Sequence, residues 1–285
     1  MTRVAVIGTG RMGAAMVGRL TGARHDVVAY NRSRPRAERL GVEVAGTPRE
    51  AATGAEVILV SLADDAAVTA VYRGADGLVA GLSPGAVVLE TSTVHPDTVR
   101  ALAPLVAELG ATLLDAPVSG SVSVVQRGEL TVMLGGDAAA LDRVRPVLHA
   151  LAARVFPLGA LGNGATMKLV VNAVVHALNQ ALCEALVLAE KAGLPRHAAY
   201  DVLAASTVAA PFVQYKRAAF EHPGTTPVAF MLDLVAKDLA LIDDLATGVG
   251  ARMDQLAANR AVVEAALKAG YGTRDLSALA EFLRA

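Results

Sequence analysis

Short apolar runs alternate with longer amphipathic segments through about the first 160 residues of the chain. The runs are almost uninterrupted by polar residues, which predicts strands that are buried on both faces of a parallel sheet. The predicted strands are residues 4–7, 27–30, 57–60, 87–90 and 112–116. Because a segment with helical spacing separates consecutive strands, the pattern indicates an α/β domain with a doubly wound sheet.

The pattern changes near residue 160, after which only helical spacing remains. Gly162-Asn163-Gly164 predicts a turn, and no residue that breaks a helix follows until Gly193 and Pro195. A helix over residues 165–192 would be roughly 40 Å long at 1.5 Å per residue. Further helices are predicted near residues 195–205, 211–219, 230–247 and 254–269. We therefore expect two domains, residues 1–162 and an all-α domain of residues 163–285, joined by the long helix and packed around a cleft.

The long helix is apolar on nearly every side, but it is a poor candidate for a membrane span. Its polar residues are scattered along its length, which a membrane helix avoids; they are Asn172, His176, Asn179, Gln180 and Glu184. A helix with no polar face is expected to be buried between neighbours, including another subunit. The sequence therefore predicts no membrane partner and a homodimer or homotetramer.

Composition excludes several classes of protein. With 285 residues, 54% of them hydrophobic and 19% charged, the chain carries too much apolar surface for a disordered protein. Lys and Arg number 26 against 27 Asp and Glu, without a basic stripe, so nucleic acid is not an expected partner. The single cysteine and the spacing of the six histidines predict neither a disulfide nor a metal site. A strand at residue 4 leaves no space for a signal segment, so we expect a cytoplasmic protein.

A glycine-rich loop follows the first predicted strand and opens a predicted helix. Its sequence is Gly8-Thr9-Gly10-Arg11-Met12-Gly13. Glycines at these three positions allow a tight turn, close approach of a pyrophosphate and close packing of helix on strand. The first domain is therefore predicted to be a Rossmann dinucleotide-binding domain.

The residues after the second predicted strand bear on the choice of cofactor. A domain that prefers NAD(H) usually has a carboxylate here, which binds the ribose hydroxyls. This chain has Asn31-Arg32-Ser33 instead. Arg32 supplies a planar cation, and Asn31 and Ser33 supply hydrogen-bond donors, so the sequence predicts a preference for NADP(H).

Two polar residues near the start of the long helix are candidates for the chemistry. Lys168 and Asn172 are four residues apart and share a helix face. A lysine in the opening turns opposes the positive end of the helix dipole, so its pKa is expected to be lowered and suited to proton transfer. His176 lies one turn further on, where a structural hydrogen bond is more common than a catalytic role.

Four motifs in the same order resemble the β-hydroxyacid dehydrogenase family over essentially the whole chain. They are the glycine loop, Asp115-Ala116-Pro117-Val118-Ser119-Gly120, Gly162-Asn163-Gly164 followed by Lys168 and Asn172, and Lys237-Asp238-Leu239. The resemblance implies that Ser119 and Gly120, with Ser121, bind a substrate carboxylate. It makes Lys168 the acid/base and Asn172 a substrate-orienting group. It also implies cofactor contacts by Leu62, Ala63, Thr93 beside Ser92, and Lys237.

The expected reaction is reversible hydride transfer between NADP(H) and a small alcohol, aldehyde or ketone that carries a carboxylate. Two departures affect the substrate more than the reaction type: Ser121 replaces a glycine common in the family, and Leu62-Ala63 lacks a proline often found there. One alternative is an imine reductase, whose relatives generally lack a lysine at position 168. Another is a non-catalytic NADPH-binding scaffold.

Overall fold

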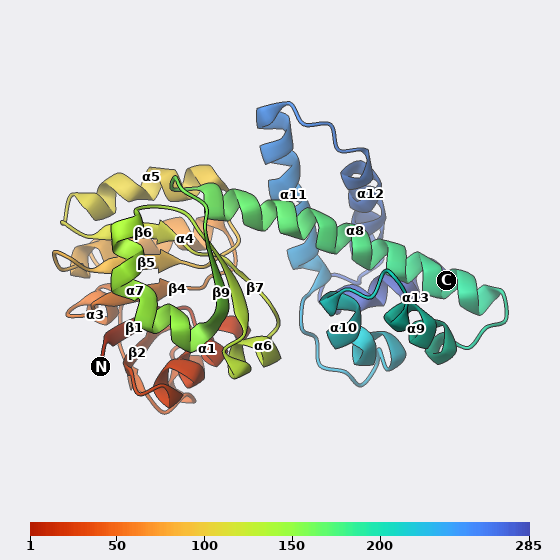
Figure 1. Cartoon of the computed structure of the whole chain (residues 1–285), viewed down its shortest axis with the longest axis horizontal. Coiled ribbons are helices and arrows are strands. Elements are labelled where there is room, and N and C mark those ends of the chain that lie inside the picture. Colours follow the sequence, from red (N-terminus) through yellow and green to blue (C-terminus); the bar gives the residue numbers. More distant parts are fainter. The chain divides into compact units, whose positions relative to one another are not determined.

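Six parallel strands form the main sheet, in the order β3-β2-β1-β4-β5-β6. The computed structural model describes residues 1–285 and divides into two units, Met1–Lys168 and Leu169–Ala285 (Figure 1). The six strands of this sheet, all in the first unit, are β1 Arg3–Ile7, β2 Asp26–Tyr30, β3 Glu43–Val44, β4 Val57–Val60, β5 Val87–Glu90 and β6 Thr112–Asp115. The five predicted strands are all present, and within this sheet only the two-residue edge strand β3 was not predicted.

The register of the strands aligns their carboxyl ends at one edge of the sheet. Ile7 pairs with both Tyr30 and Val60, and Glu90 pairs with both Val60 and Asp115. The strand order reverses between β1 and β4, and in such sheets ligands bind outside the carboxyl ends at this point. The structure confirms the predicted doubly wound α/β fold.

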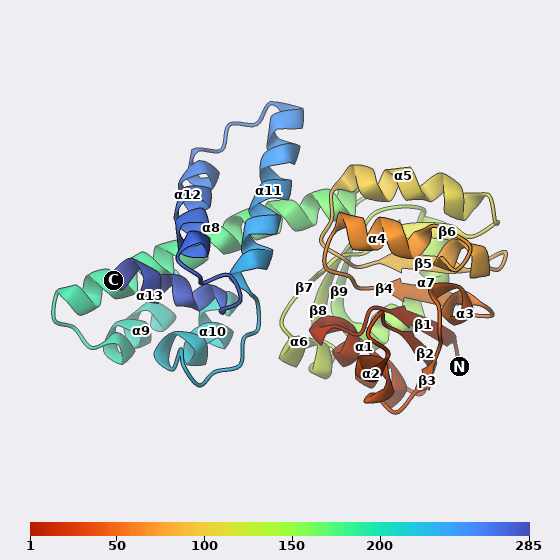
Figure 2. The same cartoon turned by 180° about the vertical axis from the view of Figure 1, so that it is seen from behind.

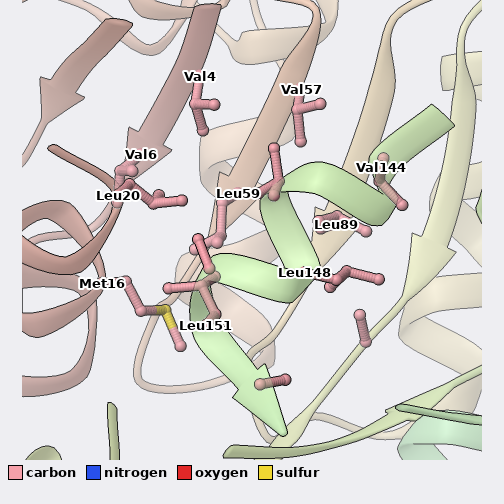
Figure 3. Packing of buried hydrophobic residues seen from close by; sticks show 14 of the residues in the cluster. Val4, Val6, Met16, Leu20, Val57, Leu59, Leu89, Val144, Leu148 and Leu151 are labelled. Atoms are coloured by element: carbon pink, nitrogen blue, oxygen red, sulfur yellow. The ribbon is translucent and has the colours of Figure 1, made fainter. Parts of the chain in front are cut away.

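Helices cover both faces of this sheet because successive side chains in a strand point to opposite faces. Val4 and Val6 pack with α1 and α7, whereas Ala5 and Ile7 pack with α3, α4 and α5 (Figures 1 and 2). Figure 3 shows the first of these cores, with Leu148 of α7 among the labelled side chains. The helices of this unit are α1 Arg11–Gly22, α2 Arg34–Glu38, α3 Pro48–Ala52, α4 Asp65–Tyr72, η1 Leu78–Gly81, α5 Pro96–Ala107, α6 Val122–Arg127 and α7 Ala138–Leu151.

A second, three-stranded sheet in this unit was not predicted. It consists of β7 Val118–Ser119, β8 Leu130–Leu134 and β9 Ala152–Pro157, with β7 antiparallel and β9 parallel to β8. A signal for β8 was present, because a five-residue run that is apolar except for Thr131 lies between Gly128 and the pair Gly135-Gly136. The other two strands gave little signal, since β7 has two residues and most of β9 is exposed.

The second unit contains helices only. Helix α8 Asn163–Lys191 begins in the first unit and continues into the second. The other helices are α9 Arg196–Ala205, α10 Pro211–Glu221, α11 Leu232–Val249, α12 Asp254–Lys268, η2 Leu276–Ala278 and α13 Leu279–Arg284. They bury one apolar core with α8, to which Cys183, Phe220 and Leu239 contribute. The predicted all-α character of the C-terminal region is confirmed, although η2 and α13 were not predicted.

Helix α8 is not covered on every side by the chain itself. Val174 and Leu188 are 66% and 71% exposed, whereas Leu182 and Leu186 are buried. By length and composition α8 meets the criterion for a membrane-spanning helix, which core helices of other proteins meet as well. The expectation of a helix without any solvent face therefore does not hold for the single chain.

Candidate active site

The glycine loop lies at the carboxyl edge of the sheet, between β1 and α1. Gly8 has φ +94°, and a Cβ there would overlap the carbonyl oxygen of Ser61. A Cβ at Gly13 would overlap the carbonyl oxygen of Gly8. A Cβ at Gly10, by contrast, would meet no protein atom within 4 Å. The packing of the chain thus requires Gly8 and Gly13, while Gly10 leaves open space at the start of the helix.

That space fits the pyrophosphate of a dinucleotide. Gly10 is the N-cap of α1, no side chain caps this end, and the first turn has no acidic residue. The first N–H groups of a helix have no partner within it and carry partial positive charge, so they attract an anion. The Thr9 hydroxyl in the same loop is buried without a hydrogen-bond partner. The N–H groups at the start of α1 are therefore available to a ligand, because no side chain of the protein caps them.

Asn31 was expected to donate a hydrogen bond to the cofactor, and in the structure it bonds to two backbone groups of the chain. Its Oδ1 accepts a hydrogen bond of 3.0 Å from the Thr9 N–H, and its Nδ2 donates to the Ser33 carbonyl oxygen. Asn31 therefore holds the glycine loop beside the end of β2, and one of its two amide hydrogens is already engaged. Arg32 and Ser33 are exposed at the same edge of the sheet.

The loops after β4 and β5 are joined by side-chain hydrogen bonds. The Ser92 hydroxyl accepts a hydrogen bond of 2.9 Å from the Leu62 N–H. Asp65, the first residue of α4, accepts hydrogen bonds from the His95 N–H at the end of the second loop and from the Thr98 hydroxyl in the first turn of α5. Leu62 and Ala63 therefore lie on a loop that is fixed to the loop of Thr93. Three of the residues predicted to contact the cofactor, Leu62, Ala63 and Thr93, therefore lie at the same edge of the sheet as the glycine loop.

The segment predicted to bind the substrate carboxylate follows β6 at the same edge. Ser119 ends the short strand β7, and Gly120 has φ +142°, where a Cβ would press on Leu130 and Val124. The Ser121 hydroxyl lies 2.9 Å from the Ser123 hydroxyl. Gly120 is therefore required by the backbone, while two serine hydroxyls flank it.

Asp115, at the end of β6, connects this segment to helix α8. Its carboxylate is fully buried and accepts hydrogen bonds from the N–H groups of Gly162 and Ala165, at 2.9 and 2.7 Å. It thus satisfies a free N–H group in the first turn of α8. Lys168 lies on α8 three residues after Ala165. Asp115 was part of a recognised motif, but its role as a clamp on the helix was not predicted.

The second unit contains a cluster of polar groups around Asp238 of α11, which is 1% exposed. Asn172 donates a hydrogen bond of 2.7 Å to its Oδ2, and His176 Nε2 lies 3.4 Å from the same oxygen. Lys237 Nζ lies 2.8 Å from Oδ1. Two predicted site residues, Asn172 and Lys237, are thus brought together by a carboxylate that is part of a recognised motif but for which no role was predicted.

Electrostatics keep Asp238 ionised in spite of its burial. Burial by itself raises the pKa of this carboxyl, but the hydrogen bond from His176 and the charge of Lys237 together lower it below the ordinary value of 3.8. A buried carboxylate of this kind holds its donors in fixed orientations. His176, which is 4% exposed, has the structural hydrogen bond expected of it.

The predicted site residues therefore form two sets. The glycine loop, Asn31 to Ser33, Leu62, Ala63 and Thr93 lie at one edge of the main sheet. Ser119 to Ser121 follow β6 in the chain and lie in and directly after β7 of the second sheet, and Lys168 is on the helix that Asp115 clamps. Asn172 and Lys237 belong to the second unit. Among the described residues, no group of three or more His, Cys, Asp or Glu side chains is placed to hold a metal ion.

Two family models match the chain from end to end. One, described as the NAD binding domain of 6-phosphogluconate dehydrogenase, matches residues 3–159. The other, described as the NAD-binding domain of NADP-dependent 3-hydroxyisobutyrate dehydrogenase, matches residues 162–283. Both the parallel sheet and the helical region are thus covered.

Individual relatives resemble the whole chain as well. The 3-sulfolactaldehyde reductase of Escherichia coli is 32% identical over 288 residues, which cover 100% of this chain and 96% of the relative. The NAD-dependent L-serine dehydrogenase of Pseudomonas aeruginosa is 31% identical over 290 residues, which cover 97% and 96%. The solved structure of Mycobacterium tuberculosis 3-hydroxyisobutyrate dehydrogenase with L-serine is 31% identical, covers 100% of both chains and has a TM-score of 0.85.

Proposed function

The chain belongs to the β-hydroxyacid dehydrogenase family of NAD(P)-dependent oxidoreductases, and on this basis we propose that it transfers a hydride between NADP(H) and a small carboxylate-bearing alcohol, aldehyde or ketone. Compounds of the 3-hydroxyisobutyrate, glyoxylate and semialdehyde type belong to this substrate class. The relatives named for L-serine and 3-hydroxyisobutyrate support the choice of a small hydroxy acid.

The observation that carries this proposal is the clamp between Asp115 and the start of α8. It joins the segment that leads to Ser119 and Gly120 directly to the helix that bears Lys168. These two hydrogen bonds link the proposed carboxylate-binding segment to the helix that carries Lys168, which supports the proposal. Precise placement of this kind is what allows an acid/base group to act on a bound substrate.

When bound, the nicotinamide supplies or accepts the hydride. In the reductive direction, Lys168 as an ammonium stabilises the negative charge that develops on the substrate carbonyl oxygen and delivers a proton to it. Asn172 orients the same oxygen through the amide hydrogen that Asp238 does not use. Ser119, Gly120 and Ser121 bind the carboxylate through hydroxyl and backbone N–H groups.

We propose NADP(H) as the preferred cofactor because Arg32 and Ser33 stand where a carboxylate would favour NAD(H). Gly8 to Gly13 hold the pyrophosphate, with further contacts from Leu62, Ala63, Thr93 and Lys237. The exposed apolar residues of α8 support a homodimer or homotetramer. We also propose that the protein works in the cytoplasm, without nucleic-acid or membrane partners.

The test is a consumption assay with NADPH and with NADH on glyoxylate, succinic semialdehyde and a cyclic imine, and an oxidation assay with 3-hydroxyisobutyrate and L-serine. We expect turnover of an aldehyde acid or a hydroxy acid and higher catalytic efficiency with NADP(H). Turnover of the imine alone would contradict the proposed substrate class. Cofactor binding without turnover of any compound would indicate a scaffold.

A further inference from the structure

Glu90, at the end of β5, is a buried acid for which the proposed reaction has no use. It is 1% exposed and lies directly before the loop of Ser92 and Thr93. Its Oε1 accepts a hydrogen bond of 2.9 Å from the Ser92 N–H, and its Oε2 accepts one of 3.0 Å from the Tyr72 hydroxyl. All of its partners are donors, which is the environment that suits an ionised carboxylate.

Ser92 connects Glu90 to the neighbouring loop, which carries Leu62 and Ala63. Its hydroxyl accepts the hydrogen bond from the Leu62 N–H, and its own backbone N–H donates to Glu90. These two hydrogen bonds link Leu62 through Ser92 to Glu90. Both loops that are predicted to contact the cofactor, at Leu62-Ala63 and at Thr93, are held by one buried carboxylate.

The acidic and phenolic groups around Glu90 come from two elements. Tyr72 and Asp65 belong to α4, and Asp115 is its register neighbour on β6, directed to the same face of the sheet. Burial raises the pKa of Glu90 to about 7, and the charge of Asp65 acts in the same direction, whereas hydrogen bonds from Ser92 and Tyr72 oppose the rise. Burial raises the pKa of Tyr72 as well, so Tyr72 remains a donor. Glu90 can therefore gain or lose a proton near neutral pH.

We infer that Glu90 is a positioning residue of the cofactor site: its ionised carboxylate holds Ser92, and through Ser92 the Leu62 N–H, so that protonation of Glu90 weakens cofactor binding. A protonated Glu90 must donate one hydrogen bond, and the Ser92 N–H cannot accept it because it is itself a donor. The proton is then shared with Tyr72, and the charge-assisted bond from the Ser92 N–H becomes an ordinary one. This inference rests on the proposed cofactor site.

The experiment measures the Kd of NADPH and of NADH from pH 6 to 8.5 by calorimetry or by cofactor fluorescence, since the chain has no tryptophan. Glu90→Gln keeps an acceptor for Ser92 but cannot ionise. Relative to this variant, the unmodified protein should bind cofactor about 3- to 10-fold more tightly at pH 8 and equally at pH 6. NADH serves as a second ligand because it lacks the 2′-phosphate, which titrates near pH 6.

Two further variants distinguish positioning from a structural role. Tyr72→Phe removes a hydrogen bond that lowers the pKa of Glu90, so the midpoint of the affinity profile should move to higher pH. Ser92→Ala leaves Glu90 in place but should abolish the pH-dependent difference. Parallel profiles for the unmodified protein and Glu90→Gln would overturn the inference while leaving the proposed function intact. Absence of binding of either cofactor at every pH would overturn both.

Discussion

Asn172 and Asp238 are joined by a hydrogen bond of 2.7 Å between two buried side chains, one on α8 and one on α11. They are 66 residues apart in the sequence. The same carboxylate lies 2.8 Å from the ammonium of Lys237. Asp238 therefore fixes the orientation of one proposed catalytic side chain and one proposed cofactor contact at the same time.

Asp238→Asn is expected to lower kcat by about 10-fold or more, because Asn172 and Lys237 lose the charge that orients them. Removing the charge from a buried pair should also cost about 3 kcal/mol of stability. Since the pKa of Asp238 is lowered on folding, this contribution is complete above the ordinary value of 3.8 and is lost as the pH falls from there through the lower pKa of the folded protein. Thermal unfolding at pH 7 and at pH 3 checks this.

The control for Asp238→Asn is Asp243→Asn on the same helix. Asp243 is half-exposed and pairs with Arg260 at the surface, so its replacement should change stability by less than about 1 kcal/mol. Equal effects of the two substitutions, or a stability difference at Asp238 that is as large at pH 3 as at pH 7, would contradict the role of the buried cluster.

Lys168→Ala is expected to lower kcat by about 100-fold or more, which is the usual scale for the loss of an acid/base group. The Kd of NADPH should remain close to that of the unmodified protein, because the glycine loop is unchanged. Steady-state assays and direct binding measure the two quantities separately. Lys191→Ala, at the exposed end of the same helix, is the control and should leave kcat unchanged. Normal turnover by Lys168→Ala would reject the proposed role.

Alanine at Gly10 and at Gly13 should have opposite consequences. A Cβ at Gly13 would overlap the Gly8 carbonyl oxygen, so Gly13→Ala should destabilise the protein by about 1–3 kcal/mol. A Cβ at Gly10 meets open space, so Gly10→Ala should cost less than about 1 kcal/mol but prevent close approach of the pyrophosphate. Thermal unfolding without cofactor and NADPH titration distinguish them. Normal NADPH affinity of Gly10→Ala would show that the ligand binds elsewhere.

Arg32→Gln should weaken NADPH binding by about 10-fold and leave NADH binding nearly unchanged, because the guanidinium is proposed to bind the 2′-phosphate. Parallel calorimetric titrations with the two cofactors give the ratio. Arg145→Gln is the control, since Arg145 pairs with Asp142 on α7 and should affect neither cofactor. An equal loss of affinity for NADPH and NADH would show that Arg32 binds a group present in both cofactors and not the 2′-phosphate.

The sequence by itself determined those features that depend on local spacing. Uninterrupted apolar runs predict strands covered on both faces, and the five main strands lie where they were predicted. The glycine loop was recognisable because its three glycines lie within six consecutive residues directly after an apolar run. The long helix was recognisable because no residue between Asn163 and Lys191 interrupts it.

Only the tertiary structure decided which buried carboxylates act on the site. Asp115 contacts residues 47 and 50 positions later, and Asp238 contacts Asn172 and His176 on another helix. Local periodicity reports whether a position is buried, but the hydrogen-bond partner of a buried acid is selected by segments that are distant in sequence. The same physical reason concealed β7 and β9, since their pairing with β8 forms only after the chain has folded back on itself.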